Sequence, residues 1–563
     1  MTRRDLIIST FAVPMLAQQS GKFEKLADDY LQAFFQARPE TATSLGEHRY
    51  DGQLANITPE SLKADLARER DFLHRARSLE TSRLDKVNQI DLRILIAHIE
   101  RTIWNDTVLR EREWNPMLYN PGSAIYYLLE RDFAGLPERL KSVQGRLDAV
   151  PGYLAAARRI LKTSTKIHAE TAVAQTQGTI NLITTVLDTY LAKAPAQSRT
   201  AIAPVQAKAV AALNEWREWM KTELLPGANQ DFRIGPELYQ AKLRHTLGSD
   251  LTAAQIRERA DRDLKQTQAM IYDTASRLTK PVAGNRTATI RAVLDKLADQ
   301  RPSGDTILGL AQRDMVEATE YVRTHNIVSL YESPLRILEM PEFQRGVAVA
   351  SCASPGPLEK NGVTFFNISP PPQGWSEAQV TSYFREYNNS MTKNLVVHEA
   401  MPGHYLQRAH ANRFKAPTLT RVVFSSGTFT EGWAVYAEKV MADAGFGGPE
   451  VRMQQLKMRL RTIINSLLDQ GIHSRGMTEG QAMDMMLTEG FQERSEAAGK
   501  WRRAMLTSTQ LSTYYTGTTE LDGLREEYVQ KHGPIQDEKA FNDRLLSFGS
   551  PAPRYIRELM GTV

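Results

Sequence analysis

A helical spacing of apolar residues runs through the first part of the chain and restricts the fold more than any other feature. Between residues 23 and 225, apolar side chains recur at positions i, i+3, i+4 and i+7, as in Phe23–Phe35 and Ile90–Ile99. This spacing puts them on one face of an α-helix. Each of four groups with Pro or Gly is expected to end a helix: 46–49, 121–122, 151–152 and 226–227. The region is therefore predicted to fold as consecutive helices.

Only two short runs have the composition of strands. Residues 345–352 and 363–368 are rich in Val, Ile and Phe, and turn-forming residues separate them. This arrangement predicts a hairpin. Helical patterning resumes after the three prolines at 370–372 and continues to the C-terminus. The predicted fold class is predominantly all-α, with a small β insertion at 345–370.

Composition excludes several classes of protein and one class of metal site. With 563 residues, 42% hydrophobic and 24% charged, the chain can bury a large core and is neither disordered nor a polytopic membrane protein. The net charge of +5 is spread out, without a dense Lys/Arg tract, so we expect no nucleic-acid partner. Cys352 is the single cysteine, which rules out an intramolecular disulfide and a CxxC metal site. A metal site must therefore use His, Asp and Glu.

The first residues have the pattern of an export signal. Arg3 and Arg4 precede a mildly apolar stretch at 6–17, which polar residues follow. This order predicts a signal peptide at 1–19, and the paired arginines resemble a twin-arginine signal. The stretch is too short to span a bilayer, so no stable membrane insertion is expected after its removal. The prediction is a periplasmic or secreted protein; the alternative is an apolar N-terminal tail.

The residues with the clearest chemistry are His398, Glu399 and His404. They resemble the HExxH helix of zinc hydrolases, with two residues added between the Glu and the second His. A spacing of six turns a regular helix by about 600°, which would put the two imidazoles on opposite sides. Pro402 cannot continue a regular helix, because it lacks an N–H and its ring would clash with the carbonyl of residue 398. We therefore expect a looped-out or widened turn at Pro402-Gly403 that lets both histidines reach one metal ion.

A catalytic zinc ion takes three protein ligands and keeps one position open. Glu431, at the start of a predicted helix 27 residues after His404, is the candidate for the third ligand. Glu438 lies seven residues further along, on the same helix face. It could orient one of the metal ligands by a hydrogen bond without binding the metal itself. The structural alternatives are two buried histidines and two ordinary helix carboxylates.

These residues carry the resemblance to a known family. The chain resembles the DUF885 proteins, whose hallmarks are an HExxPGH motif and a downstream EGWAxYAE helix, here His398–His404 and Glu431–Glu438. Further blocks that look like the family's stand at 42–51, 471–474, 514–517 and 524–525. The resemblance implies an architecture similar to helical gluzincin peptidases, with two helical lobes around a deep cleft. It also implies one zinc ion per chain, held by His398, His404 and Glu431, with Glu399 as the general base.

The expected chemistry is hydrolysis of a peptide by a zinc-activated water. A second donor must stabilise the tetrahedral oxyanion, and Tyr514, Tyr515 and His473 are the candidates, Tyr514 first because it lies in a family block. Arg525 could bind a substrate carboxylate, although a surface arginine is the simpler interpretation. The strand at 363–368 could offer an edge to a peptide backbone, with Asn367 in contact.

The predicted organisation follows these assignments. It has an N-terminal helical region at 20–245 and a catalytic region at 246–563, with the zinc-site helices at 394–443. The leading hypothesis is an exported zinc metallopeptidase with a peptide substrate. The alternatives are a zinc amidohydrolase acting on non-peptide amides and a non-catalytic helical binding protein that retains the metal site.

Overall fold

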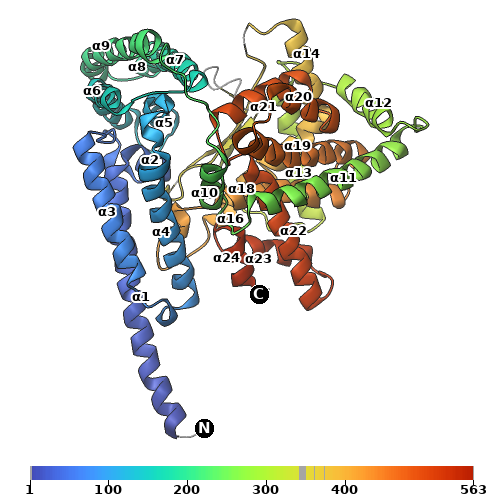
Figure 1. The fold of residues 1–563 in the computed structure, drawn as a ribbon, viewed down its shortest axis with the longest axis horizontal. Helices are drawn as coiled ribbons and strands as arrows, with labels where there is room; N and C mark the ends of the chain where they lie inside the picture. Colours follow the sequence, from blue (N-terminus) through green and yellow to red (C-terminus); the bar gives the residue numbers. More distant parts are fainter. Residues whose placement is uncertain (1–2, 341–349, 361, 373, 562–563) are drawn as a thin grey trace. The chain divides into compact units, whose positions relative to one another are not determined.

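The computed structural model describes residues 3–340, 350–360, 362–372 and 374–561, with side chains described from residue 20 onward. It divides into two compact units (Figure 1). Unit 1 contains Met1–Phe232, Pro355–Gly362 and Lys415–Phe424. Unit 2 contains Arg233–Ser354, Val363–Phe414 and Ser425–Val563. Helices predominate in both units, which confirms the predicted fold class.

Unit 1 is built from amphipathic helices around two hydrophobic clusters. One cluster lies among α1, α3 and α4, which pack side by side, and the other lies among α5 to α9 (Figure 1). The helices of this unit are α1 (Arg3–Ala37), α2 (Pro39–Leu45), α3 (Pro59–Arg77), α4 (Lys86–Trp104), α5 (Gly122–Glu130), α6 (Leu136–Ile160), α7 (Lys166–Asn181), α8 (Leu187–Leu191), α9 (Ala196–Trp219) and α17 (Thr420–Val423).

One predicted helix boundary in unit 1 is wrong. Pro151 and Gly152 lie inside α6, which continues to Ile160. Leu147, Val150 and Leu154 are buried on either side of the proline. Burial of the same apolar face before and after Pro151 outweighs the one backbone hydrogen bond that proline removes.

Two later segments return to unit 1 and are held there by buried polar contacts. Arg421 forms an ion pair with Asp91 of α4 at 2.6 Å, and both side chains are almost fully buried. The N–H of Leu358 donates to the carbonyl of Leu45 at 2.9 Å. The core of unit 1 is therefore completed by residues far along the chain.

Unit 2 contains the remaining helices and a small sheet. Its hydrophobic cluster is lined by α13, α15, α16, α18 and α22, among others. The helices of this unit are α10 (Pro236–Leu247), α11 (Ala253–Leu278), α12 (Arg286–Asp299), α13 (Ile307–Thr324), α14 (Glu377–Glu386), α15 (Asn389–Glu399), α16 (His404–Ala411), α18 (Gly427–Asp443), α19 (Gly448–Arg475), α20 (Glu479–Asp484), α21 (Arg494–Leu506), α22 (Ser512–His532), α23 (Glu538–Leu546) and α24 (Pro553–Met560).

The sheet has three strands in the order β1-β3-β2. β2 (Ala350–Ala353) pairs antiparallel with β3 (Thr364–Ile368), as the hairpin prediction required, and residues 345–349 of the predicted first strand lie outside the described residues. β1 (Leu335–Glu339) pairs parallel with β3 and was not predicted. Only one of its five residues is β-branched, so its strand conformation depends on pairing with β3. The prediction of 363–368 as an edge strand is wrong, because β3 is central and paired on both sides.

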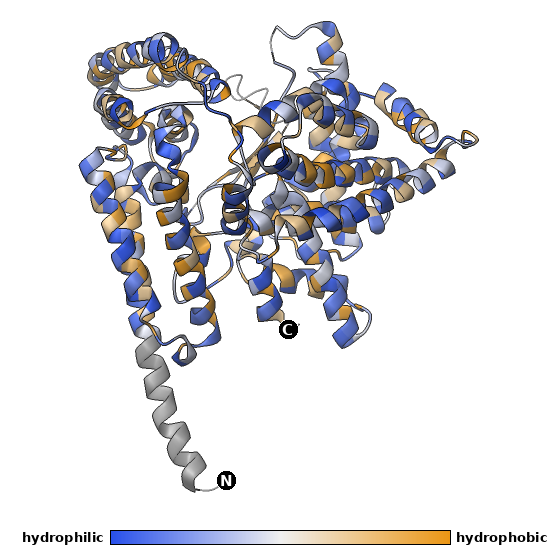
Figure 2. Cartoon of the chain, in the orientation of Figure 1, coloured by the Kyte–Doolittle hydropathy of each residue, from blue (hydrophilic) through white to orange (hydrophobic). Residues whose placement is uncertain are grey.

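The distribution of hydropathy agrees with helices that bury one face. Figure 2 shows hydrophilic and hydrophobic residues together on the long helices. Among the described residues, none of the helices combines the length and the apolarity needed to cross a membrane.

Candidate metal centre

The helix that carries His398 is fixed at its start and buried along most of its length. The side chain of Asn388 accepts a hydrogen bond from the backbone N–H of Met391, which caps α15. Met391, Val396 and Val397 are almost fully buried in the core of unit 2. This packing holds the last turn of α15, where His398 and Glu399 lie.

The helix is interrupted between the two histidines. α15 ends at Glu399 and α16 begins at His404. The N–H of Gly403 donates to the carbonyl of Val397 at 2.9 Å, so the chain folds back against its own last turn. A Cβ atom at position 403 would lie 1.8 Å from the carbonyl oxygen of His398, which leaves glycine as the residue that fits.

This interruption brings three metal-ligating side chains together. His398, His404 and Glu431 each offer one donor atom, and these atoms lie within 4.8 Å of one another. The Nε2 atoms of His398 and His404 lie 3.7 and 3.5 Å from Oε2 of Glu431. Both distances are too long for hydrogen bonds, and this buried oxygen has no hydrogen-bond partner among the described residues.

The spacing of the donor atoms fits a tetrahedral zinc ion. Zinc–ligand bonds of 2.0–2.1 Å separate tetrahedral donors by about 3.3 Å. The distances of 3.7 and 3.5 Å to Glu431 are close to that value. A buried carboxylate oxygen without a hydrogen-bond donor, close to two imidazole nitrogens, has surroundings that a cation would satisfy. The residues present therefore fit a zinc ion.

Glu438 holds the first of these histidines in place. Nδ1–H of His398 donates to Oε1 of Glu438 at 2.7 Å, and Nδ2–H of Asn394 donates to Oε2 of the same carboxylate at 2.8 Å. The side chain of Glu438 is completely buried. With its Nδ1 proton engaged, His398 presents Nε2 as the free ligand atom.

The protonation of Glu431 and the protonation of His398 depend on each other. Burial alone would raise the pKa of Glu431, but the imidazoles of His398 and His404 hold that pKa well below its usual range. Burial alone would lower the pKa of His398, but Glu431 and Glu438 raise it well above its usual value. Two carboxylates thus surround a histidine that favours positive charge, and a divalent cation satisfies the same electrostatic demand.

The helix of Glu431 is locked against its neighbours by close contacts. Nε1–H of Trp433 donates to the carbonyl of Pro402 at 2.9 Å, which ties α18 to the turn between the histidines. A Cβ atom at Gly432 would lie 2.4 Å from the backbone of Gly517, and one at Gly517 would lie 2.0 Å from the carbonyl of Thr428. The two glycines let the backbones of α18 and α22 come into direct contact. This contact fixes the position of α18, and with it the position of Glu431.

Glu399 is the residue after the first histidine and the last of α15. It is rotated by about 100° from His398 and is 8% exposed. A buried carboxylate thus stands next in sequence to the cluster without being one of its three members.

Three residues predicted to stabilise an oxyanion are held by other contacts. The hydroxyl of Tyr514 accepts hydrogen bonds from Arg503 and Gln510 at 3.1 and 3.3 Å. The hydroxyl of Tyr515 donates to Asp263 at 2.8 Å. Nε2–H of His473 donates to two backbone carbonyls, at 2.8 and 2.9 Å.

Three residues were predicted as substrate contacts; Tyr515 is described above, and Arg525 and Asn367 are also held by or buried in the fold. Both terminal nitrogens of Arg525 pair with Glu538, at 2.5 and 2.6 Å, and one also donates to the hydroxyl of Tyr436. Asn367 is 3% exposed on the central strand β3. Neither side chain is presented as a free group for a ligand.

Asn394 is a site residue that the sequence reasoning missed. Its amide holds Glu438, which in turn holds His398. It lies four residues before His398, on the same face of α15, and this spacing is the signal that could have identified it.

Comparisons with known proteins agree with this fold and assign no activity. A family model described as a bacterial protein of unknown function, DUF885, matches residues 39–560. The structure is similar to that of a candidate lipoprotein of unknown function from Shewanella oneidensis, with a TM-score of 0.81 and 33% identity over 96% of this chain and 99% of that one. A candidate lipoprotein from Colwellia psychrerythraea has a TM-score of 0.79 and 17% identity, over 97% and 98% of the two chains, and shows the fold alone. The comparison with curated proteins gives no match.

Proposed function

The chain belongs to the DUF885 family of bacterial proteins, and we propose that it is a zinc-dependent metallopeptidase. The observation that supports this most is the cluster of His398, His404 and Glu431, in which Glu438 hydrogen-bonds to His398. Two imidazoles and one carboxylate leave a fourth tetrahedral position for substrate or water, as in catalytic zinc sites. A structural zinc site would be closed by a fourth protein ligand.

Each residue of the cluster has a distinct part in the proposed reaction. A zinc ion in this site supplies Lewis acidity, which activates a water molecule and polarises a carbonyl group. Glu399 accepts a proton from the attacking water and passes it to the nitrogen of the leaving amine. Glu438 keeps His398 in the tautomer that presents Nε2, and Asn394 keeps Glu438 in place.

Replacement of Glu399 by Gln separates catalysis from metal binding. The change keeps the shape of the side chain and removes the base, so zinc content and thermal stability are expected to change little. Turnover of a peptide library, read by mass spectrometry, is expected to fall by roughly a hundredfold or more. Glu60→Gln, an exposed residue of unit 1, is the matched control.

The outcomes distinguish the proposed function from its alternatives. Loss of zinc in Glu399→Gln would show that Glu399 is a ligand, and unchanged turnover would show that another group is the base. A wild-type protein that holds zinc and cleaves small amides but no peptide would be an amidohydrolase. One that binds peptides and cleaves neither class would be a binding protein.

We place this activity in the cell envelope. Arg3 and Arg4 ahead of an apolar stretch resemble a twin-arginine signal, and both similar structures are of candidate lipoproteins. Replacing both arginines with lysine should retain the protein in the cytoplasmic fraction of a bacterial host, while the unmodified chain is exported. Equal export of both would contradict the twin-arginine assignment.

A further inference from the structure

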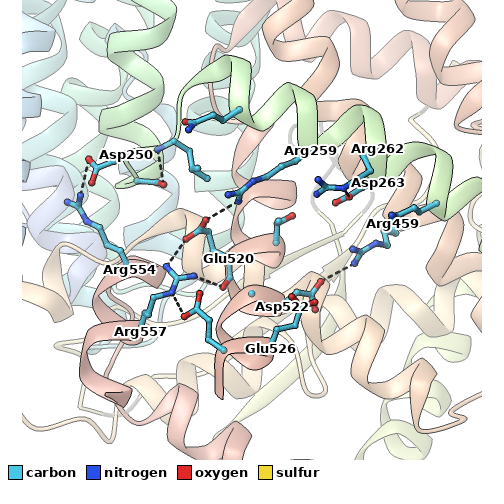
Figure 3. Close-up of a pocket in the computed structure, with 17 residues that line it drawn as sticks. Asp250, Arg259, Arg262, Asp263, Arg459, Glu520, Asp522, Glu526, Arg554 and Arg557 are labelled. Carbon is cyan, nitrogen blue, oxygen red and sulfur yellow. Dashed lines mark hydrogen bonds and ion pairs between the residues drawn. The ribbon is translucent and has the colours of Figure 1, made fainter. Parts of the chain in front are cut away.

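Two of the cavities among the described residues of unit 2 are lined by charged and polar residues outside the His398, His404 and Glu431 cluster, and they differ in charge balance. The larger, of about 950 Å³, lies between α11, α22 and α24 (Figure 3). Its arginines are already matched: Arg259 and Arg557 pair with Glu520 at 3.7 and 3.1 Å, and Arg459 pairs with Asp522 at 3.4 Å. A cavity whose cations are neutralised from within gives no indication of a charged ligand.

The smaller cavity, of about 200 Å³, combines an excess of positive charge with unsatisfied amides. It lies between α12, the α14–α15 junction, α19 and the segment before α21. We call it the amide pocket, and its lining residues used below are Arg291, Arg385, Gln454, Lys457, Gln492 and Arg494.

Two glutamine side chains in the amide pocket are buried without all their hydrogen bonds. Gln492 is 4% exposed, and neither its Oε1 nor its Nε2 has a partner within the described part of the chain. Gln454 is fully buried, and its Oε1 also lacks a partner, while its Nε2 donates to Asn388 at 3.3 Å. Buried amides without partners are rare, because each lost hydrogen bond destabilises the fold. Both side chains therefore have hydrogen-bonding groups that a bound molecule or water can satisfy.

The arginines and lysine of the pocket are only partly neutralised. Lys457 pairs with Glu386 at 2.8 Å, and Arg385 pairs with Asp295 at 2.6 Å and Glu493 at 3.1 Å.

The two remaining cations have no carboxylate partner. Arg291 donates to the backbone carbonyl of Leu487 at 2.8 Å, and Arg494 is exposed, with no ion pair recorded for it within the described residues. Arg291 also lies 5.5 Å from the ring centroid of Phe491, whose φ of 53° is unusual for a bulky residue and sets the position of the next residue, Gln492. Both arginines are exposed and line the same pocket as the unsatisfied amides, so the pocket has positive charge to attract an anion.

We propose that the amide pocket binds a small carboxylate that carries an adjacent hydrogen-bond donor, as a free amino acid or a hydroxy acid does. The carboxylate would face Arg291, Arg494 and Nε2 of Gln492, and the ammonium or hydroxyl group would donate to the free amide oxygens. A volume of about 200 Å³ corresponds to roughly seven water molecules, which suits a ligand of this size better than a peptide of several residues. The proposal does not depend on the zinc site, because the pocket shares no residue with it.

Four matched three-carbon probes test the proposal on the purified full-length protein. L-alanine and L-lactate have both groups, propionate lacks the donor, and L-alaninamide lacks the carboxylate. Isothermal titration calorimetry and thermal unfolding should show binding of L-alanine or L-lactate, and whichever binds identifies the donor as ammonium or hydroxyl. Propionate and L-alaninamide should bind at least about tenfold more weakly.

Two variants assign the binding to this pocket. Gln492→Met removes the unsatisfied amide, so it should weaken binding by about tenfold or more without lowering the melting temperature of the free protein. Arg494→Gln changes an exposed side chain and should weaken binding similarly even if Gln492→Met fails to fold. Arg554→Gln, in the larger cavity, is the control and should bind as the wild type does.

Three results would overturn the proposal. The first is no binding of any probe at millimolar concentration, which would mean that water satisfies the amides. The second is equal binding of propionate, which would remove the role of the donor. The third is wild-type affinity in a folded Gln492→Met or Arg494→Gln variant, which would place the ligand elsewhere.

Discussion

The carboxylate of Glu438 shows how a single side chain can orient a residue of the proposed zinc site without being one of its three ligands. Its two oxygens accept hydrogen bonds from His398 and Asn394 in a fully buried position. These two hydrogen bonds fix the carboxylate, and the carboxylate in turn orients the imidazole. Histidine ligands held in this way bind metal more tightly than free ones.

Replacing Glu438 with Gln should therefore weaken zinc binding rather than abolish it. An amide accepts a hydrogen bond less strongly than a carboxylate, so we expect a loss of about 10- to 100-fold in zinc affinity. Competition with a chromogenic chelator measures it, with Glu60→Gln as the control. Unchanged affinity would show that His398 is oriented by other contacts.

His48, in unit 1, is a second histidine whose charge the structure controls. It hydrogen-bonds Asp51 at 2.8 Å and also Glu359, and it stacks on Phe133. Burial alone would lower its pKa, but the two carboxylates raise the pKa to about 9. The imidazolium thus links the segment after α2 to Pro355–Gly362.

The stability of unit 1 should consequently fall as the pH rises. The folded-state pKa of His48 lies above the unfolded value of 6.5, so its contribution is complete below pH 6.5 and is lost as the pH rises to about 9. We expect a loss of about 1 kcal/mol after allowing for solvent screening, measured by urea unfolding across this pH range. His48→Gln should remove this dependence, whereas exposed His74→Gln should retain it. An unchanged pH profile in His48→Gln would contradict the assignment.

At the level of elements, the turn between α15 and α16 depends on a residue without a side chain. Gly403→Ala would drive a methyl group into the carbonyl of His398, so we expect a loss of about 3 kcal/mol of stability and a loss of zinc binding. Gly427→Ala, at the start of α18, is the matched control, because a Cβ there meets open space. Calorimetry and zinc analysis of both variants check the prediction. A stable Gly403→Ala that retains zinc would mean that the turn can relax.

Elements were predictable where local chemistry decides them. The spacing in Phe23–Phe35 indicated a helix because one face of α1 is buried there, and Pro402 indicated an interruption because its ring excludes a regular helix. The sequence also indicated the three residues of the cluster, although not their separations.

Contacts through space were not predictable in the same way. Pro151 remains inside α6 because residues on both sides share a buried face. Nothing in the sequence connects Arg525 to Glu538, with which it pairs in the fold. The strand conformation of β1 depends on its pairing with β3 rather than on the β propensity of its own residues. Each of these depends on neighbours that the chain brings together by folding.

At the level of the whole molecule, the metal should stabilise one unit and leave the other unchanged. The cluster lies wholly in unit 2, and a ligand that binds only the folded state raises its stability by about 3 kcal/mol at a hundredfold excess over Kd. Removing zinc with a chelator should lower one calorimetric transition by several degrees. The transition that responds to His48→Gln should not move. A single transition that shifts as a whole would contradict this independence.

The return of Lys415–Phe424 to unit 1 has a consequence for how the protein is made. Asp91 leaves the ribosome early, yet the guanidinium that compensates its buried charge arrives only with Arg421. Until then, closing the first unit around α4 would bury an unpaired carboxylate, which is unfavourable. Synthesis of this chain therefore passes through a long interval in which its leading part is incomplete and its apolar faces are open to chaperones.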